Sequence, residues 1–378
     1  MFYFAGIILS LFFAFVLFTK KGKNTSDYLL AVWLLFIGWH LGSYYLTKQD
    51  YYLVNPALIG LGLPLPLVHG AFLYVYIKAL TDPKPMTWSI LIYFTPFVFA
   101  YFIFAPFFFL SHEDQINVYK NEGHPYEKRL LIHSILLNVV GVFYIIRSYL
   151  QLSQYRQSLK NQFSNIEKIR LDWLTYLIVW IGLLWLVIIF IQKDALIFAV
   201  AVFFILWLGY FGIRQVSLFQ NSDILYTPSS VILQTRPGLE LTIPEPENEI
   251  KTGPIKYQKS SLSDEASEEI YSRLKEIMQN EKCYKDPEIR LTQLANYLNV
   301  NPNYLSQVIN SKENKNFYDF INEYRVQEFK DSLTVPANKN YTLLALAMEC
   351  GFNSKTSFNR NFKKVTGIAP TEYASGLK

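Results

Sequence analysis

The chain has only two cysteines in 378 residues, Cys283 and Cys350, and they lie far apart in the sequence. Neither a disulfide framework nor a paired thiol site is therefore expected. The sequence also lacks a GxSxG nucleophile elbow, a phosphate-binding loop, an HExxH zinc helix and a CxxC pair. No histidine-kinase or cyclase domain follows its last apolar segment. We therefore predict no catalytic residues, no cofactor and no enzymatic activity.

Charge is scarce as well: Asp, Glu, Lys and Arg make up 17% of the chain, whereas 51% is hydrophobic and 17% is aromatic. This balance is unusual for a soluble protein. The apolar excess lies in roughly the first 215 residues, in blocks of about 18 to 22 residues that could each cross the hydrocarbon core of a bilayer. Seven spans are predicted, near residues 2–19, 29–47, 57–80, 88–110, 130–150, 174–192 and 195–214. Residues 1–216 thus predict a polytopic bundle of seven helices with the lipid bilayer as a partner.

The orientation of the spans follows from the lysines and arginines in their connections. No basic residue precedes the first span and a basic cluster follows it, so we expect an uncleaved span with its N-terminus outside. The inner connections then hold ten basic residues and the outer ones five. An odd number of spans places the C-terminus in the cytoplasm. The predicted location is the cell (inner) membrane.

Residues 342–373 predict two short helices joined by a tight turn. Thr342 is a good N-cap, and Leu343, Leu346, Ala347 and Cys350 share one helical face. Gly351 stands where a helix end favours a left-handed residue, and Asn353 or Ser354 can cap the next helix. The second helix is polar and basic on its outward side. This is helix-turn-helix geometry.

The same pattern occurs once more upstream. Thr292 is expected to cap a first helix whose apolar face is Leu294, Ala295 and Leu298, with Asn299 in the turn. Asn301 followed by Pro302 predicts the start of the second helix. A further helix, with Phe317, Phe320, Ile321 and Tyr324 on one face, joins the two units.

Residues 262–375 resemble the DNA-binding module of the AraC family. The signature residues are Gly351, Phe352, Phe358, Arg360, Phe362, Lys363, Lys364, Thr366, Gly367, Pro370 and Tyr373. Phe329 departs from the pattern, because the family more often has a small residue there. The resemblance implies that the second helix of each unit enters the major groove of promoter DNA, in grooves about one helical turn apart. The matching outward positions are Asn303, Ser306 and Gln307 in the first unit and Lys355, Thr356 and Arg360 in the second, with Lys363 and Lys364 nearer the phosphates. For Ser306 and Thr356 the alternative is simple solvation of a helix face.

A linker is predicted between the two domains, over residues 217–261, from its prolines and acids. The DNA-binding domain then covers residues 262–378, where Ser263 caps a helix with an apolar stripe. That stripe consists of Ala266, Ile270, Leu274, Ile277 and Met278. It could pack on the first helix-turn-helix unit, or it could mediate contact in a homodimer.

Polar residues within the predicted spans are candidates for sensing a ligand. They are His40, His69, His133 and Asn138. The alternative is that they form hydrogen bonds between helices and hold the bundle together. Gly60, Gly62, Pro64 and Pro66 are expected to break the third span just before His69. A broken helix beside a polar side chain can frame a ligand pocket, but it is also a common packing kink.

The longest outer connection, residues 111–129, contains His112, Glu113, Asp114 and His124. These side chains could bind a metal in principle, but their spacing matches no closed zinc site. A solvated loop without metal is expected.

Two functions remain from different classes. The first is a membrane-bound one-component transcription regulator, in which the seven-span domain senses an unknown signal ligand and the C-terminal module binds promoter DNA. The second is a membrane transporter or enzyme with an appended regulatory domain. The scarcity of charge in the spans and the absence of an evident inverted repeat weigh against transport.

Overall fold

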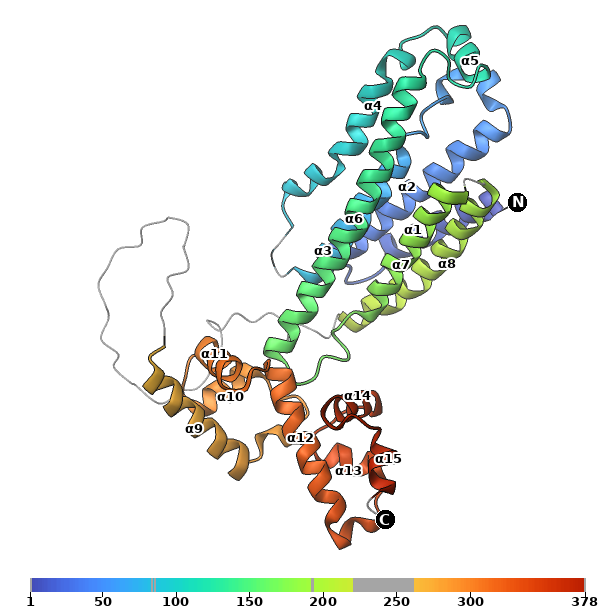
Figure 1. Ribbon diagram of the computed structural model, residues 1–378. Coiled ribbons are helices and arrows are strands. Elements are labelled where there is room, and N and C mark those ends of the chain that lie inside the picture. Colours follow the sequence, from blue (N-terminus) through green and yellow to red (C-terminus); the bar gives the residue numbers. More distant parts are fainter. Residues whose placement is uncertain (1, 83, 85, 192–193, 220–261, 377–378) are drawn as a thin grey trace. The chain divides into compact units, whose positions relative to one another are not determined.

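The computed structural model describes residues 2–82, 84, 86–191, 194–219 and 262–376 (Figure 1). This part of the chain is all-helical, with no β-strand. Its contacts divide the chain into two compact units. The N-terminal unit contains Met1–Tyr155 and Asp172–Leu239, and the C-terminal unit contains Arg156–Leu171 and Glu240–Lys378. Most of the predicted linker, 220–261, lies outside the described residues.

Each of the seven predicted spans overlaps an apolar helical segment of the N-terminal unit. Its helices are α1 (Phe2–Thr19), α2 (Thr25–Lys48), α3 (Leu65–Thr81), α4 (Thr95–Phe108), α5 (His112–Lys120), α6 (Glu127–Gln162), α7 (Asp172–Leu186) and α8 (Asp194–Phe219). The end of α6, from Arg156 onwards, belongs to the C-terminal unit. Four segments are long and apolar enough to cross a membrane, judged by length and composition alone: Thr25–Lys48, Trp88–Phe108, Glu127–Gln162 and Asp172–Ile191. Tyr3–Thr19, Leu65–Thr81 and Leu196–Phe211 are apolar but shorter.

The third segment differs from the predicted span over 57–80, because α3 begins only at Leu65. Before it, a 3₁₀ turn covers Pro56–Leu58, and Gly60 has a φ of 79°. Glycine adopts this left-handed conformation without strain, and Pro64 forms the N-cap of α3. The chain therefore enters the helix four residues before His69. A similar 3₁₀ segment, Trp88–Phe94, precedes α4.

The connection over residues 111–129 also differs from the predicted solvated loop. Its residues 112–120 form α5, and the Ser111 hydroxyl accepts a hydrogen bond from the Asp114 backbone N–H. Glu113 and Asp114 then lie in the first turn, where the helix dipole favours acidic side chains. A serine cap followed by two acids is a helix-start signal that the overall polarity of the stretch obscures.

The packing of the N-terminal unit is centred on α3, which is buried on most of its circumference. Its buried side chains include Leu67, Phe72, Leu73 and Tyr76. Helix α2 packs against α1 and α3, and α8 packs against α1. By contrast, α4 and α6 expose large apolar side chains, among them Phe99, Phe102, Ile135, Val139 and Phe143. Apolar surfaces of this extent are unusual on a soluble monomer and suit contact with lipid.

The C-terminal unit consists of two helical groups that share one long helix (Figure 1). Its helices are α9 (Asp264–Asn280), α10 (Leu291–Leu298), α11 (Pro302–Glu313), α12 (Phe317–Thr334), α13 (Leu343–Glu349), α14 (Lys355–Thr366) and α15 (Pro370–Ser375). The first half of α12 contributes Phe317, Phe320 and Ile321 to a core with α9, α10 and α11. Its second half contributes Val326 and Phe329 to another core with α13 and α14.

The apolar stripe of α9 is buried in the first of these cores. Ile270, Leu274 and Met278 pack there beside Leu294 and Leu298 of α10. Packing, rather than contact with a second copy, therefore accounts for this stripe. The side chains of both cores lie within residues 262–373, so neither core draws a side chain from the described residues before 262.

Most of the predicted helix starts and turns of this unit are confirmed. The side chains of Ser263, Asn301, Thr342 and Ser354 each accept a hydrogen bond at the start of a helix. Asn299 and Gly351 have positive φ angles of 52° and 95°. The prediction that Thr292 caps α10 is wrong. The N-cap is Arg290, whose backbone N–H donates to the Gln293 side chain at 2.8 Å.

Phe329, the departure from the AraC pattern, is fully buried. Its ring centroid lies 4.6 Å from that of Phe358 and 5.5 Å from that of Phe362. The large side chain thus fills the space between α12 and α14 with an aromatic cluster. Such ring pairs stabilise the fold by more than the burial of their apolar area alone.

Glu328 joins α12 to the turn before α10, and its contacts make the unit sensitive to acid. Its carboxylate accepts from Lys282, Lys285 and the Tyr284 hydroxyl. Burial alone would raise the pKa of Glu328, but these hydrogen bonds lower it to about 2.

Because the folded-state pKa lies below the unfolded value, the stabilisation is present above about pH 4.5 and is lost as the pH falls towards 2. Urea unfolding of fragment 255–378 should show decreasing stability across this window, and Glu328→Gln should flatten the curve. An unchanged pH profile in the variant would contradict the assignment.

Candidate nucleic-acid interface

Helix α11 presents the three predicted positions on its outer side. Asn303 and Gln307 are exposed and Ser306 is half-buried, whereas Leu305, Val308 and Ile309 are buried in the core. Helical spacing separates the two sets, because residues three and four apart share a face. Asn310 continues the exposed face, and its amide donates to the Ser306 carbonyl at 2.8 Å. Asn310 was not among the positions predicted from the sequence.

Helix α14 has the same two-sided character. Lys355, Thr356 and Lys363 are exposed, while Phe358 and Phe362 are buried. Asn359 lies between Lys355 and Lys363 at a spacing of four residues and is also exposed. Its place on this face could have been read from the helical period. The face combines two lysines with polar groups, as contact with phosphates and base edges requires.

Lys364 is exposed but paired: its ammonium lies 2.7 Å from the Asp319 carboxylate of α12. The side chain of Lys364 is 56% exposed, so the pair is screened and weak. The ammonium can therefore leave Asp319 for a phosphate at small expense.

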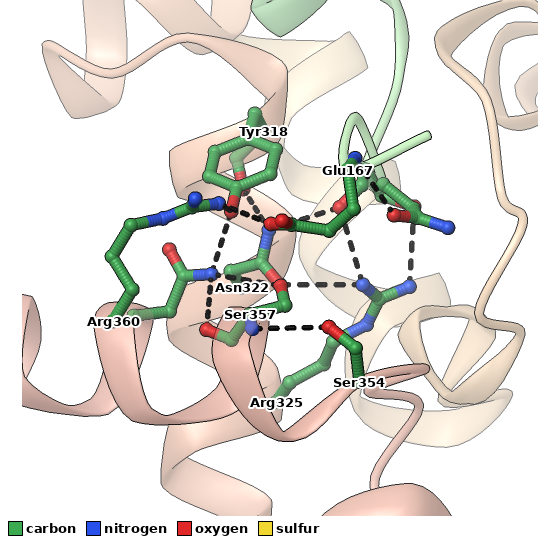
Figure 2. Close-up of polar contacts among 10 residues, drawn as sticks. Glu167, Tyr318, Asn322, Arg325, Ser354, Ser357 and Arg360 are labelled. Carbon is green, nitrogen blue, oxygen red and sulfur yellow. Dashed lines mark hydrogen bonds and ion pairs between the residues drawn. The ribbon is translucent and has the colours of Figure 1, made fainter. Parts of the chain in front are cut away.

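Arg360 does not have the open position that its helical spacing predicts. Its guanidinium donates to the Glu167 carboxylate and to the Tyr318 hydroxyl, each at 2.6 Å. Figure 2 shows the Arg360 side chain turned towards these two groups. Burial alone would lower the pKa of Arg360, but Tyr318 and Glu167 outweigh it and raise the pKa. Tyr318 also accepts from the Asn361 amide at 2.7 Å, which fixes the hydroxyl beside the arginine.

Glu167 belongs to the segment between α6 and α7 and is 193 positions from Arg360. Its neighbour Ser164 is buried and donates from its hydroxyl to the Ile289 carbonyl at 2.8 Å. The Ser164 carbonyl accepts from the Asn322 amide at 3.1 Å and from Arg325 at 3.4 Å. Sequence analysis did not find this segment, because its residues match no motif.

Arg325 is the polar centre of the C-terminal unit and is only 1% exposed. Its guanidinium donates to the carbonyls of Tyr284 and Asp286 at 2.7 Å each and to the Ser164 hydroxyl at 3.2 Å. Burial lowers the pKa of Arg325 to about 10, so the side chain keeps its charge at neutral pH. A buried guanidinium with its donors satisfied by carbonyls holds several loops in one arrangement.

The N-terminal unit contains a cavity of about 580 Å³ between α2, α3, α4, α5 and α6. Apolar side chains such as Ile59, Phe104 and Phe107 form most of its wall. His40 and His133 both line it, so the structure brings these two predicted residues to one site. The Nε2 atom of His133 is buried and has no hydrogen-bond partner among the described residues.

His69 lies behind His40 in a chain of hydrogen bonds. The Trp33 indole N–H donates to His69 Nδ1 at 3.3 Å, and His69 Nε2 lies 3.0 Å from His40 Nδ1. Because the indole can only donate, neutral His69 carries its proton on Nε2 and donates it to His40. His40 then carries its own proton on Nε2. The fourth candidate, Asn138, instead donates to the Ser134 carbonyl of its own helix at 2.9 Å.

The acidic and histidine residues of the outer connection do not form a metal site. Across the described ranges, no three His, Cys, Asp or Glu side chains come together in a geometry that could hold an ion. His124 instead lies 2.5 Å from the Glu127 carboxylate.

A helix-turn-helix domain family matches residues 294–376, which cover α11 to α15 and most of α10. The uncharacterized HTH-type transcriptional regulator YtdP of Bacillus subtilis (strain 168) is 30% identical over 88 residues. That match covers 23% of this chain and 11% of the relative. A solved structure of a protein of unknown function from Listeria innocua is 28% identical and covers 28% of this chain and 94% of its own, with a TM-score of 0.24. The C-terminal unit therefore contains a helix-turn-helix domain of the kind found in DNA-binding transcription regulators.

Proposed function

We propose that the chain is a membrane-bound one-component transcription regulator. The observation that carries this proposal is the polar outer face of α11 and α14, within a helix-turn-helix domain that follows seven apolar helical segments in one chain. The module binds promoter DNA, and the N-terminal unit spans the membrane seven times and responds to a signal. No enzymatic step is required for this activity.

In the proposed complex, α11 and α14 enter successive major grooves of the duplex. Asn303, Ser306 and Gln307 face the first groove, and Lys355, Thr356 and Arg360 face the second. Lys363 and Lys364 neutralise phosphates. The C-terminal 90 residues carry eleven basic and seven acidic residues, a modest excess for a DNA-binding protein. We therefore expect base contacts to matter as much as charge in setting affinity.

The signal ligand is proposed to occupy the cavity beside His40 and His133. The apolar wall favours a ligand with an apolar body, and the polar groups would orient it. His40 offers an Nε2–H donor at the end of the Trp33–His69–His40 chain. His133 Nε2 offers the second hydrogen-bonding atom. Such a site would change the helices only if the ligand bound two of their arrangements with different affinity.

A selection experiment tests the DNA-binding part of the proposal. Fragment 255–378 is incubated with a pool of random 40-base-pair duplexes, and bound sequences are enriched and identified. We expect an enriched sequence with two conserved blocks about one helical turn apart, because α11 and α14 would read separate grooves. A Gln307→Ala, Lys355→Ala variant serves as the control that should lose enrichment while keeping its helical circular dichroism. A folded fragment that enriches no sequence would overturn the proposed function.

Membrane topology gives a separate prediction. Cysteines introduced at Glu113 and Lys160 should differ in their accessibility to a membrane-impermeant maleimide in intact cells. The proposed orientation puts residue 113 outside and residue 160 inside, so only the first should react. Both should react once the membrane is permeabilised, which controls for burial of either site. Labelling at 160 and protection at 113 in intact cells would reverse the whole scheme.

A further inference from the structure

The segment 163–167 is continuous in sequence with α6 and α7 but is packed within the DNA-binding unit. Ser164 and Ile166 are 1% exposed, so the segment is seated in the unit rather than lying on its surface. Phe163 forms an antiparallel bridge with Arg290, and its ring lies 5.5 Å from the Arg290 guanidinium. Asn165 donates to the Glu288 carboxylate at 3.0 Å. These contacts fix the segment to the strand-like stretch that leads into α10.

The same segment also reaches the other two parts of the unit. Ser164 binds Asn322 and Arg325 on α12, the helix shared by both cores. Glu167 binds Arg360 on α14. Five consecutive residues thus contact the start of one helix-turn-helix pair, the joining helix and the second helix of the other pair. A segment held in this way constrains how the two pairs are oriented relative to each other.

The contact with α14 also changes whether the Arg360 guanidinium is available to DNA. One guanidinium nitrogen of Arg360 donates to both Glu167 and Tyr318, and the Arg360 side chain is only 35% exposed. Its guanidinium can turn fully towards DNA only after it leaves the Glu167 carboxylate. If Glu167 stays in place, its carboxylate also repels the phosphates that would approach Arg360. Docking of the segment therefore competes with full engagement of α14 by DNA.

We propose that segment 163–167 is an internal ligand of the DNA-binding module that competes with DNA for Arg360 and holds the two helix-turn-helix pairs in a non-binding arrangement. The proposal rests on the proposed function, since it assigns regulation to the same DNA-binding face. The occupant is part of this chain, and its chemistry is complementary: a carboxylate for the arginine and a backbone carbonyl and hydroxyl for the buried polar centre.

The segment is placed to transmit a signal because it stands between α6 and α7 in the chain. Any change in the separation or rotation of the ends of these helices acts directly on residues 163–171. The signal would then reach the module through residues 163–171 and not through residues 220–261. A ligand in the N-terminal unit would then control DNA binding by pulling Glu167 and Ser164 out of the module, a two-state change in which the docked and released forms differ in DNA affinity.

The first test removes the charge of Glu167 in the full chain, reconstituted in lipid nanodiscs and titrated with the duplex that fragment 255–378 selects. Glu167→Gln should bind about five to ten times more tightly than the wild type, at the lower end of usual coupling between sites. Its preference for the selected duplex over an unrelated duplex should also rise, because Arg360 becomes available to a base edge. Glu276→Gln, which removes the same charge from an exposed position on α9, should bind within about twofold of the wild type.

The second test locks the segment in place. Residues opposite each other in an antiparallel bridge have Cα atoms about 4.5 to 5.5 Å apart, within the range that a disulfide spans. Phe163→Cys with Arg290→Cys, in a Cys283→Ser background, should therefore form a disulfide across this bridge. Oxidation should lower affinity for the selected duplex at least about tenfold, and reduction should restore it. The reduced form controls for loss of the two side chains.

The two tests separate this proposal from the function on which it rests. If the fragment selects no duplex, the proposed function fails. If the fragment binds and the oxidised lock binds DNA as tightly as its reduced form, the competition is overturned while the function stands. Equal affinities of Glu167→Gln and Glu276→Gln would also overturn it. Should Glu167→Gln not fold, the lock alone decides.

Discussion

Replacing Gly351 by alanine should destabilise fragment 255–378 by about 2 to 5 kcal/mol, enough to remove much of the stability of a small domain. Gly351 has a φ of 95°, which strains any residue with a Cβ atom. An added Cβ would also lie 2.4 Å from the Tyr284 carbonyl oxygen and 2.9 Å from Arg325 Nε. These atoms are hydrogen-bonded to each other at 2.7 Å, so neither can retreat without breaking the polar centre of the unit. Urea unfolding followed by circular dichroism measures the loss.

Gly367 provides a matched control for backbone strain alone. Its φ is 83°, similar to that of Gly351, but no atom lies within 4 Å of an added Cβ. Gly367→Ala should therefore cost only about 1 to 2 kcal/mol, the usual expense of a left-handed residue. The difference between the two variants isolates the close approach of the turn to Tyr284. Equal losses would show that the turn does not rest on this hydrogen bond.

Local signals predicted the C-terminal unit well because its elements are determined by neighbouring residues. Ser263, Asn301, Thr342 and Ser354 cap the helices that follow them, and each cap depends on residues two or three positions away. The burial of Phe358 and Phe362 likewise follows from helical period. The seven apolar segments were found by the same kind of local reasoning, although the start of α3 was misplaced because two prolines and two glycines were read as a kink within a helix.

Contacts between distant residues could not be predicted in this way. Nothing near Arg360 in the sequence indicates that Glu167 would occupy its guanidinium, and helical spacing alone placed Arg360 on an open face. The pairing of His40 with His69 is similar, since 29 positions separate the two rings and only the packing of α2 on α3 brings them together. A sequence gives the chemistry of each side chain, but partners across the fold depend on tertiary packing. The residue types of the candidate site could therefore be predicted from the sequence, whereas the contact of Glu167 with Arg360 could not.

Arg360→Ala should have different effects in the fragment and in the full chain. In fragment 255–378, which lacks Glu167, the arginine is available to DNA, and its loss should weaken binding to the selected duplex by about 1 to 3 kcal/mol and relax preference at one or two base pairs. In the full chain, wild-type Arg360 also binds Glu167 and Tyr318 in the absence of DNA. Loss of the Glu167 contact offsets part of the binding free energy that Arg360 gains from DNA. The loss on substitution should then be smaller than in the fragment. Competition with labelled duplex in both proteins measures the two values.

Lys364→Ala is the comparison that distinguishes a base contact from a phosphate contact. Lys364 is exposed and leaves only the screened pair with Asp319, so its loss should weaken all sequences alike and reduce the salt slope by about one unit. Its effect should also be the same in the fragment and in the full chain, because its partner Asp319 is present in both. Arg360→Ala should instead change sequence preference and depend on the presence of Glu167. If both substitutions leave affinity unchanged in a salt titration of the folded fragment, α14 does not read DNA.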